Sequence, residues 1–297
     1  MKIEHLSQES ILLLEKSDSE RINFILKDNW VGYPQAKKIL KDMEELLEIP
    51  KIDRMPNMLL VGETNNGKSA ILKKFLDMYP PYVDEEKGTA HRPVFLIQAQ
   101  PSPDESRFYG QILHEAFYPH GKLERAETKQ LKVIKALSDL HVKVLVIDEF
   151  HHVLTGTANK QRIFLNVIKY LANELKISII AAGIKEAYYV LSTDSQLMNR
   201  FKPKILPKWE LNEDYYRLLA TFEYRMPLKK KSNILEGNLP TKILVMSEGT
   251  IGEISNIIKL ACKEAILRGE EKITHNILEK IDYISPSKRK QLIEKIR

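Results

Sequence analysis

The sequence predicts an α/β domain built around a mostly parallel, five-stranded sheet, followed by a small all-helical domain. Two observations predict this fold class. As far as residue 209, short apolar runs alternate with segments of helical periodicity, which is typical of parallel strands joined by crossover helices. After residue 210 no strong strand signal follows, and helical periodicity continues alone.

The individual elements follow from their apolar spacing. A first helix is expected from Ala36 to the helix-ending Pro50. Apolar runs predict strands at 58–61, 93–97, 142–147, 177–182 and, more weakly, 205–209, where Pro207 favours a sheet edge. Between the strands, helical spacing predicts helices at 105–118, 127–140 and 160–175. In the second domain it predicts helices at 212–225, 240–247, 252–268 and 274–283.

The glycine-rich loop after the first strand carries the strongest functional signal. It fits the pattern G-x-x-x-x-G-K-[ST] of phosphate-binding loops, and it has the strand before it and the helix after it that this pattern requires. A chance glycine-rich turn is the weaker alternative. The residues are Gly62, Glu63, Thr64, Asn65, Asn66, Gly67, Lys68 and Ser69, with Ala70 next in the helix.

Each residue type in this loop has a physical role. Gly62 and Gly67 are expected to let the backbone turn tightly, so that successive N–H groups point into one concave site. The helix that begins near Lys68 adds the positive end of its dipole. Lys68 would contact the β- and γ-phosphates of ATP, and the Ser69 hydroxyl would ligate Mg²⁺.

Two acids, Asp148 and Glu149, follow the apolar strand at 142–147. The carboxyl ends of parallel strands are where ligands bind in an open sheet. Asp148 is therefore expected to hold the Mg²⁺ shell opposite Ser69, and Glu149 to polarise a water for attack on the γ-phosphate. An ordinary exposed strand end is the alternative. The pair favours ATP hydrolysis over nucleotide binding alone.

Arg200 stands just before the last predicted strand. A guanidinium can stabilise charge that develops on the γ-phosphate, and such an arginine is often supplied by a neighbouring subunit. A surface salt bridge is the alternative that spacing alone favours. His151 and His152 follow the two acids, but no cysteine or third histidine lies at ligand spacing, so no metal other than Mg²⁺ is expected.

Bulk composition narrows the function classes. The net charge of +6 permits a nucleic-acid partner without proving one. The single cysteine, Cys262, forms no intrachain disulfide and suits a reducing cytoplasm. No apolar run approaches the roughly 18 residues that span a bilayer, and residues 1–5 lead into no signal-peptide core. We therefore expect a cytoplasmic protein without a membrane segment.

Together, these motifs resemble the AAA+ P-loop ATPases, and within them the TniB/TnsC group of ATPases that regulate DNA transposition. Many AAA+ proteins share the order of features seen here. The phosphate-binding loop comes first, followed by the strand that ends in Asp-Glu, the strand that ends at Gly183, Arg-Phe at 200–201 and a helical lid. Three flanking stretches are similar to TniB proteins and point to transposition: 30–36, 54–62 and 247–252. The resemblance covers about residues 21–283.

The resemblance implies a bacterial, ATP-dependent regulator that oligomerises as a ring or helical filament on duplex target DNA. It would recruit the transposase, be coupled to a TniQ-type target-selection protein, and disassemble when ATP is hydrolysed. It also implies site roles: Lys68 and Ser69 for phosphate and Mg²⁺, Asp148 and Glu149 as metal and hydrolysis acids, and Arg200 as an arginine finger acting on a neighbour's ATP.

Two positions depart from the family pattern. A Thr or Asn sensor often ends the fourth strand, but Ile184 and Lys185 follow Gly183 here. An Arg or Lys sensor often stands in the lid where this chain has Glu253, and a carboxylate there is expected to repel the γ-phosphate. The resemblance further places DNA contacts between the second and third strands, where Arg107, Lys122 and Arg125 are the candidates. A merely solvated helix face is the alternative for these charges.

The predicted organisation is a lead-in at 1–20, an AAA+ ATP-binding domain at 21–210, a helical lid at 211–285 and a basic tail at 286–297. Two other functions remain as alternatives. One is an AAA+ helicase loader or replication-initiator-like ATPase, which would bind a helicase instead of a transposase. The other is a nucleotide-dependent signalling switch that does not bind DNA.

Overall fold

The computed structural model describes residues 5–27 and 30–295, so residues 1–4 of the predicted lead-in and 296–297 of the predicted tail lie outside it. The chain forms two compact units. The α/β unit comprises residues 35–207, and the helical unit combines residues 1–34 with 208–297. This grouping differs from the predicted organisation, because it joins residues 21–34 and the lead-in to the C-terminal helices.

A five-stranded sheet forms the centre of the α/β unit, with all its strand pairs parallel. The strand order is β4-β5-β6-β1-β7, so β1 and β5 are separated by one strand. The strands are β1 (Asn57–Gly62), β4 (Val94–Gln98), β5 (Val144–Asp148), β6 (Ser178–Gly183) and β7 (Phe201–Leu206). The prediction of a mostly parallel five-stranded sheet is confirmed.

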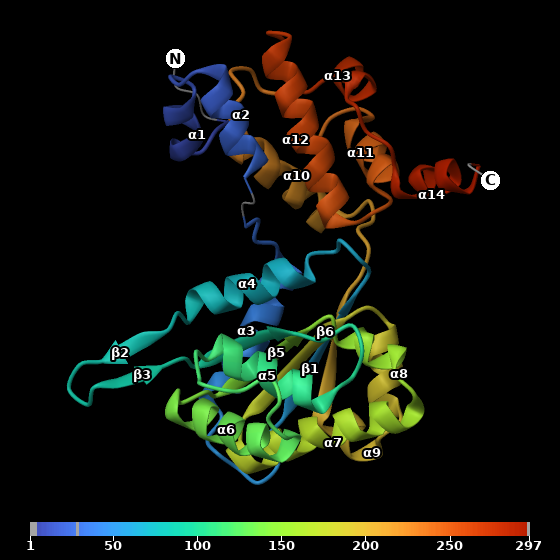
Figure 1. Cartoon of the computed structure of the whole chain (residues 1–297). Coiled ribbons are helices and arrows are strands. Elements are labelled where there is room, and N and C mark those ends of the chain that lie inside the picture. The colour runs from blue at the N-terminus through green and yellow to red at the C-terminus, as the bar shows by residue number, and fades with distance from the viewer. Residues whose placement is uncertain (1–4, 28–29, 296–297) are drawn as a thin grey trace. The chain divides into compact units, whose positions relative to one another are not determined.

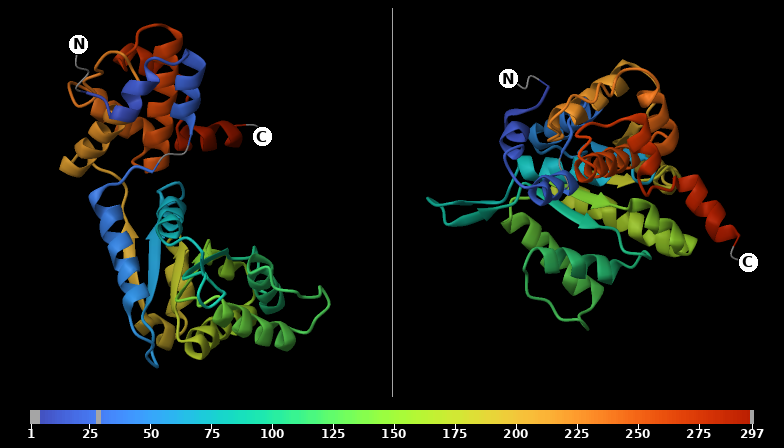
Figure 2. Two further views of the ribbon diagram at one scale, coloured as in Figure 1. Left: turned by 90° about the vertical axis from the view of Figure 1, so that its left-hand side faces the viewer. Right: turned by 90° about the horizontal axis from the view of Figure 1, so that it is seen from above.

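Helices cover both faces of this sheet (Figures 1 and 2). Alternate strand residues, such as Leu59, Ile97 and Ile147, join a buried apolar cluster with one set of helices. The helices of the unit are α3 (Pro34–Glu48), α4 (Lys68–Met78), α5 (Glu105–Glu115), α6 (Ala126–Asp139), the 3₁₀ helix η1 (Phe150–Thr155), α7 (Ala158–Leu175), α8 (Glu186–Ser192) and α9 (Ser195–Arg200).

The strands of the α/β unit differ from the sequence prediction in two respects. The last strand lies at residues 201–206 instead of 205–209, although it does occupy a sheet edge beside β1. There Pro203, which has no N–H to donate, is tolerated. An antiparallel hairpin of β2 (Tyr82–Asp84) and β3 (Thr89–His91) was not predicted, since its strands have only three residues each. Figure 1 shows the hairpin projecting from the unit.

The helical unit is built around α12 (Ile251–Leu267), whose buried face includes Ile254, Ile258 and Ala261. Among the described residues of this unit the structure has no strand, as predicted. The other helices are α1 (Gln8–Leu13), α2 (Asp18–Leu26), α10 (Glu213–Arg225), α11 (Leu239–Ser247), α13 (His275–Lys280) and α14 (Pro286–Glu294). Across residues 5–27 and 30–295, the length and apolar character needed to cross a bilayer do not occur together in any helix.

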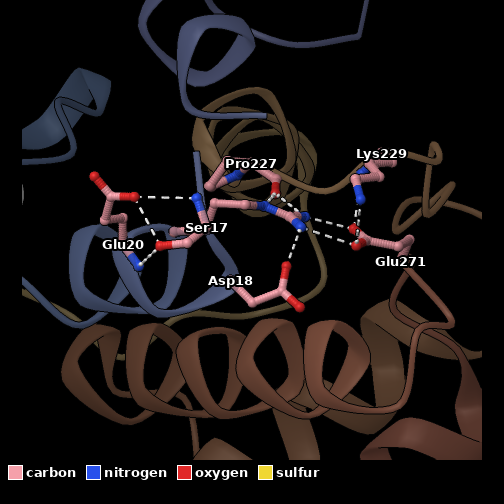
Figure 3. Close-up of polar contacts among 7 residues, drawn as sticks. Ser17, Asp18, Glu20, Pro227, Lys229 and Glu271 are labelled. Atoms are coloured by element: carbon pink, nitrogen blue, oxygen red, sulfur yellow. Dashed lines mark hydrogen bonds and ion pairs between the residues drawn. The ribbon is translucent and has the colours of Figure 1, made fainter. Parts of the chain in front are cut away.

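The side chain of Arg21, on α2, explains why the N-terminal residues belong to the helical unit. The side chain is fully buried, and its guanidinium forms two hydrogen bonds with the Glu271 carboxylate and two with the carbonyl oxygen of Pro227 (Figure 3). The N–H of Lys229 also donates to Glu271. A capping box between Ser17 and Glu20 begins α2 beside these contacts.

This cluster gives a prediction about stability. Arg21→Ala leaves the nearly buried Glu271 carboxylate without its main partner, and we expect it to lower the free energy of unfolding of the helical unit by about 3 kcal/mol. Asp18→Ala is the matched control. Its carboxylate also contacts Arg21 but is 61% exposed, so we expect a loss below about 1 kcal/mol.

The measurement is denaturant unfolding followed by tryptophan fluorescence. Both tryptophans of the chain, Trp30 and Trp209, belong to the helical unit, so the signal reports on that unit. Equal losses of stability in the two variants would show that the buried ion pair does not hold α2 in place.

Candidate functional site

The phosphate-binding loop joins β1 to α4, and its two glycines serve different purposes. Gly67 has a φ of 85° and forms the N-cap of α4, a left-handed conformation that favours glycine. Gly62 is the last residue of β1, where an added Cβ would lie 3.0 Å from the Cβ of Leu206 on β7. The expectation that both glycines make tight turns therefore holds for Gly67, whereas Gly62 allows β7 to approach closely.

Asn66 ties the loop to the end of β7. Its side chain is buried, and Nδ2 donates to the carbonyl oxygens of Leu206 (3.0 Å) and Pro207 (2.9 Å). Sequence reasoning included Asn66 in the loop but assigned it no separate task. The motif treats this position as variable, so only the fold reveals the anchor.

Lys68 begins α4 and bends back over the loop. Its Nζ donates to the carbonyl oxygens of Gly62 (2.8 Å) and Glu63 (2.9 Å). Burial lowers the pKa of Lys68, and the negative charges of Glu149 and Asp148 oppose that shift. The loop thus holds a positive charge at its centre, as a phosphate site requires.

Ser69 and Asp148 meet at the carboxyl end of the sheet. The Ser69 hydroxyl donates to Oδ2 of Asp148 at 2.7 Å, and Oδ1 of the same carboxylate accepts the N–H of Glu149 at 2.8 Å. The carboxylate is therefore oriented from both sides. A hydroxyl and a carboxylate that converge at an exposed edge are hard oxygen donors of the kind that Mg²⁺ prefers. The predicted metal pair fits this ion.

Glu149 follows β5 in a left-handed conformation with a φ of 54°, which is uncommon for a residue other than glycine. Oε2 of its carboxylate lies 3.2 Å from Nδ1 of His151. Burial lowers the pKa of His151, and the charge of Glu149 opposes this shift, so the ring is mainly neutral at pH 7.

Glu149, His151 and His152 bring potential metal-ligating atoms within 4.8 Å of one another. The sequence argument against a further metal considered only cysteine and histidine and did not count Glu149 as the third ligand. One ring nitrogen of His152, Nδ1, is already 3.3 Å from the carbonyl oxygen of Ala99. We assign no metal to this group.

Arg200 ends α9, where its Nη1 donates to Oδ1 of Asn173 on α7 at 2.6 Å. Within the chain its guanidinium therefore meets an uncharged side chain, and the prediction that it acts on a neighbour's ATP remains a proposal. Lys185, at the N-cap of α8, is exposed.

The predicted DNA contacts lie on α5 and on the connection from α5 to α6. Arg107, Lys122 and Arg125 are all exposed. Lys129 is buried and donates to Ser106 at 3.1 Å, which brings the start of α6 beside the start of α5. Arg125, the N-cap of α6, and Arg107, in the first turn of α5, therefore lie in one region.

Glu253, at the expected sensor position, is buried at the start of α12. Its carboxylate accepts hydrogen bonds from Tyr283 (2.8 Å) and from Arg289 of α14 (2.6 Å). The predicted basic tail is thus held to the helical unit at the start of α14, where the N–H of Ser287 also donates to Glu248. The carboxylate that was expected to repel the γ-phosphate is buried and is paired within the helical unit.

These features define a class. A parallel sheet with the phosphate-binding loop on β1, an Asp-Glu pair on the non-adjacent β5 and a helical C-terminal region is the fold of AAA+ P-loop ATPases. Within this class, a family model described as bacterial TniB protein matches residues 21–211, and the chain belongs to the TniB family. The comparison with curated proteins found no match.

Solved structures have the same fold. The Orc1 protein of Aeropyrum pernix in complex with DNA is 16% identical, with a TM-score of 0.60 over 91% of this chain and 69% of that chain. The ORC2 protein of the same organism, in ADPNP–ADP complexes, is 15% identical, with a TM-score of 0.58 over 86% and 70%. Drosophila ORC bound to DNA is 14% identical, with a TM-score of 0.58 over 90% and 65%.

The anchor at Asn66 gives a prediction about nucleotide binding. Asn66→Ala leaves two carbonyl oxygens at the end of β7 without this donor, at a cost of about 1–3 kcal/mol. Because the loop loses its tie to the sheet, we expect the Kd for ATP to rise about tenfold, which corresponds to about 1.4 kcal/mol.

Titration with a fluorescent ATP analogue measures this effect. Thr64→Ala is the control, since Thr64 is an exposed loop residue and the substitution keeps its backbone N–H. An unchanged Kd in Asn66→Ala would mean that the loop keeps its shape without the anchor.

Proposed function

We propose that this protein is an ATP-dependent DNA-binding regulator of transposition that oligomerises on target DNA and hydrolyses ATP. The observation that carries the proposal is the convergence of Lys68, Ser69 and Asp148 at one end of the sheet, in a chain of the TniB family. The convergence of these three residues supports the binding and hydrolysis of ATP. Membership of the TniB family supports a role in transposition.

In the proposed reaction, Lys68 and the loop from Gly62 to Ser69 bind the phosphates of ATP. Ser69 and Asp148 would hold Mg²⁺, which would supply positive charge to offset the negative charge of the phosphates. Glu149 orients a water and accepts its proton as the water oxygen attacks the γ-phosphorus and the bond to the bridging oxygen breaks. Arg200 stabilises the γ-phosphate of a neighbouring subunit.

DNA would be bound through its phosphates by Arg107, Lys122 and Arg125. Contacts of this kind carry no sequence information and weaken strongly with salt. Two nearby cations contribute less, because Lys129 is buried against Ser106 and Lys132 pairs with Glu124 at 2.7 Å.

In the same proposal, the assembled protein recruits a transposase and is coupled to a TniQ-type target selector in the bacterial cytoplasm. Hydrolysis of ATP then drives disassembly of the ring or filament. This assignment would fail in favour of a helicase loader if the protein bound a helicase instead of a transposase.

The first test is assembly on DNA. We expect regular rings or filaments on duplex DNA with a non-hydrolysable ATP analogue, and none for Lys68→Ala, because the loop then lacks the charge that holds the phosphates. Negative-stain microscopy measures the outcome. Arg200→Ala should assemble with the analogue but hydrolyse ATP at least tenfold more slowly, since a trans arginine acts mainly on the transition state.

A mixture of the two variants tests whether Arg200 acts on the ATP of a neighbouring subunit. Lys68→Ala supplies Arg200 but no working loop, whereas Arg200→Ala supplies a working loop, so a mixture of the two should recover ATPase activity. Dispersed particles that ignore DNA at low salt would instead favour a nucleotide-dependent signalling protein.

A second test concerns the DNA face. Lys122→Ala and Arg125→Ala should each weaken DNA binding about equally for all sequences and reduce the slope of log K against log salt by about 1 per lost phosphate contact. Fluorescence anisotropy over a salt series measures this slope. Lys37→Ala, an exposed lysine on α3, is the matched control and should leave the slope unchanged.

A further inference from the structure

His151 occupies a fixed position at the carboxyl end of the sheet. Its ring packs against His152, with ring centroids 4.7 Å apart, and it lies over the end of β6. An added Cβ at Gly183 would lie 3.4 Å from Nδ1 of His151, 3.3 Å from its backbone nitrogen and 3.0 Å from the Cβ of Ala187. The glycine that ends β6 thus leaves the space that His151 fills.

The Nδ1 atom of His151 faces Glu149. The atom is buried and has no hydrogen-bond partner among the residues that the structure describes. Oε2 of Glu149 is nevertheless 3.2 Å away, which is within ion-pair distance but not aligned for a hydrogen bond. Hydrogen bonds of catalytic groups are often poorly aligned before substrate binds and improve when it does.

The side chains of His151 and Glu149 differ in how far they are exposed to solvent. The His151 side chain is 20% exposed, whereas that of Glu149 is 33% exposed and extends from a left-handed backbone. A buried N–H that lacks another acceptor favours the carboxylate orientation that satisfies it. The ring therefore constrains the carboxylate more than the carboxylate constrains the ring.

We propose that His151 is a positioning residue for ATP hydrolysis, whose Nδ1–H holds Oε2 of Glu149 so that Oε1 faces the attacking water. This inference rests on the proposed ATPase function. It gives a task to a histidine that the nucleotide site otherwise leaves unused, and it places that task beside Gly183, where no polar side chain ends β6.

The test is steady-state ATPase kinetics with Mg²⁺ and ATP. We expect His151→Ala to lower kcat about tenfold and to leave KM and the affinity for a fluorescent ATP analogue unchanged, because the ring acts on Glu149 and not on the phosphates. His151→Asn places an N–H near the position of Nδ1 and should restore most of kcat. Exposed His114→Ala is the matched control and should keep the wild-type rate.

A double variant separates positioning from a merely structural role. If His151 acts through Glu149, then His151→Ala in a Glu149→Gln background should cause no further loss of kcat. Gly183→Ala provides a second route, since its Cβ crowds His151 without changing the ring, and it should lower kcat while ATP still binds.

The outcomes distinguish the inference from the function on which it rests. A wild-type protein with no ATPase activity that depends on Lys68 and Glu149 would overturn the proposed function. An active wild type that loses its activity in Glu149→Gln but keeps it in His151→Ala would overturn the inference alone. A higher kcat in His151→Ala, or an additive loss in the double variant, would also overturn it.

Discussion

The position of β6 between β1 and β5 is the constraint on which the candidate site depends. It separates the phosphate-binding loop from Asp148 and Glu149 by one strand, which leaves room at the carboxyl end of the sheet for a ligand to lie between them. Gly183, at the end of β6, leaves the space that His151 fills beside these acids. The hydrogen bond from Ser69 to Asp148 spans the same gap, so a shift of β6 would disturb the loop and the acids together.

A second constraint acts in the helical unit, where buried charge joins segments distant in sequence. Arg21 bonds Glu271 and the carbonyl oxygen of Pro227, so three segments meet at one guanidinium. Tyr33 packs edge-on against Trp209 at 5.0 Å, which brings together the two points where the chain leaves this unit. These contacts explain why the N-terminal residues group with the C-terminal helices instead of forming a separate lead-in.

The sequence predicts the parts of the site that local pattern determines. The loop from Gly62 to Ser69 and the Asp148–Glu149 pair have fixed spacing around a strand end, and the AAA+ fold follows from their order. The contacts of Arg21, Asn66 and His151 could not be predicted, because each joins residues whose proximity depends on packing. The predicted position of the last strand, 205–209, was wrong for a related reason. The strand lies at 201–206 because its pairing with β1 overrides the weak apolar pattern around Pro203.

In the helical unit, Glu253 occupies a sequence position to which the family pattern assigns a different role. Glu253 stands where the resemblance implies a cationic lid sensor, and an exposed carboxylate there would repel a phosphate. In this structure the carboxylate is buried and paired with Arg289 at 2.6 Å, so its charge is largely compensated and its contacts hold α14 to the unit. A residue committed to docking α14 is poorly suited to detect a γ-phosphate. We therefore assign the proposed response to nucleotide to the α/β unit, where His151 contacts Glu149, the proposed hydrolysis acid, and Arg200 is partly exposed at the end of α9.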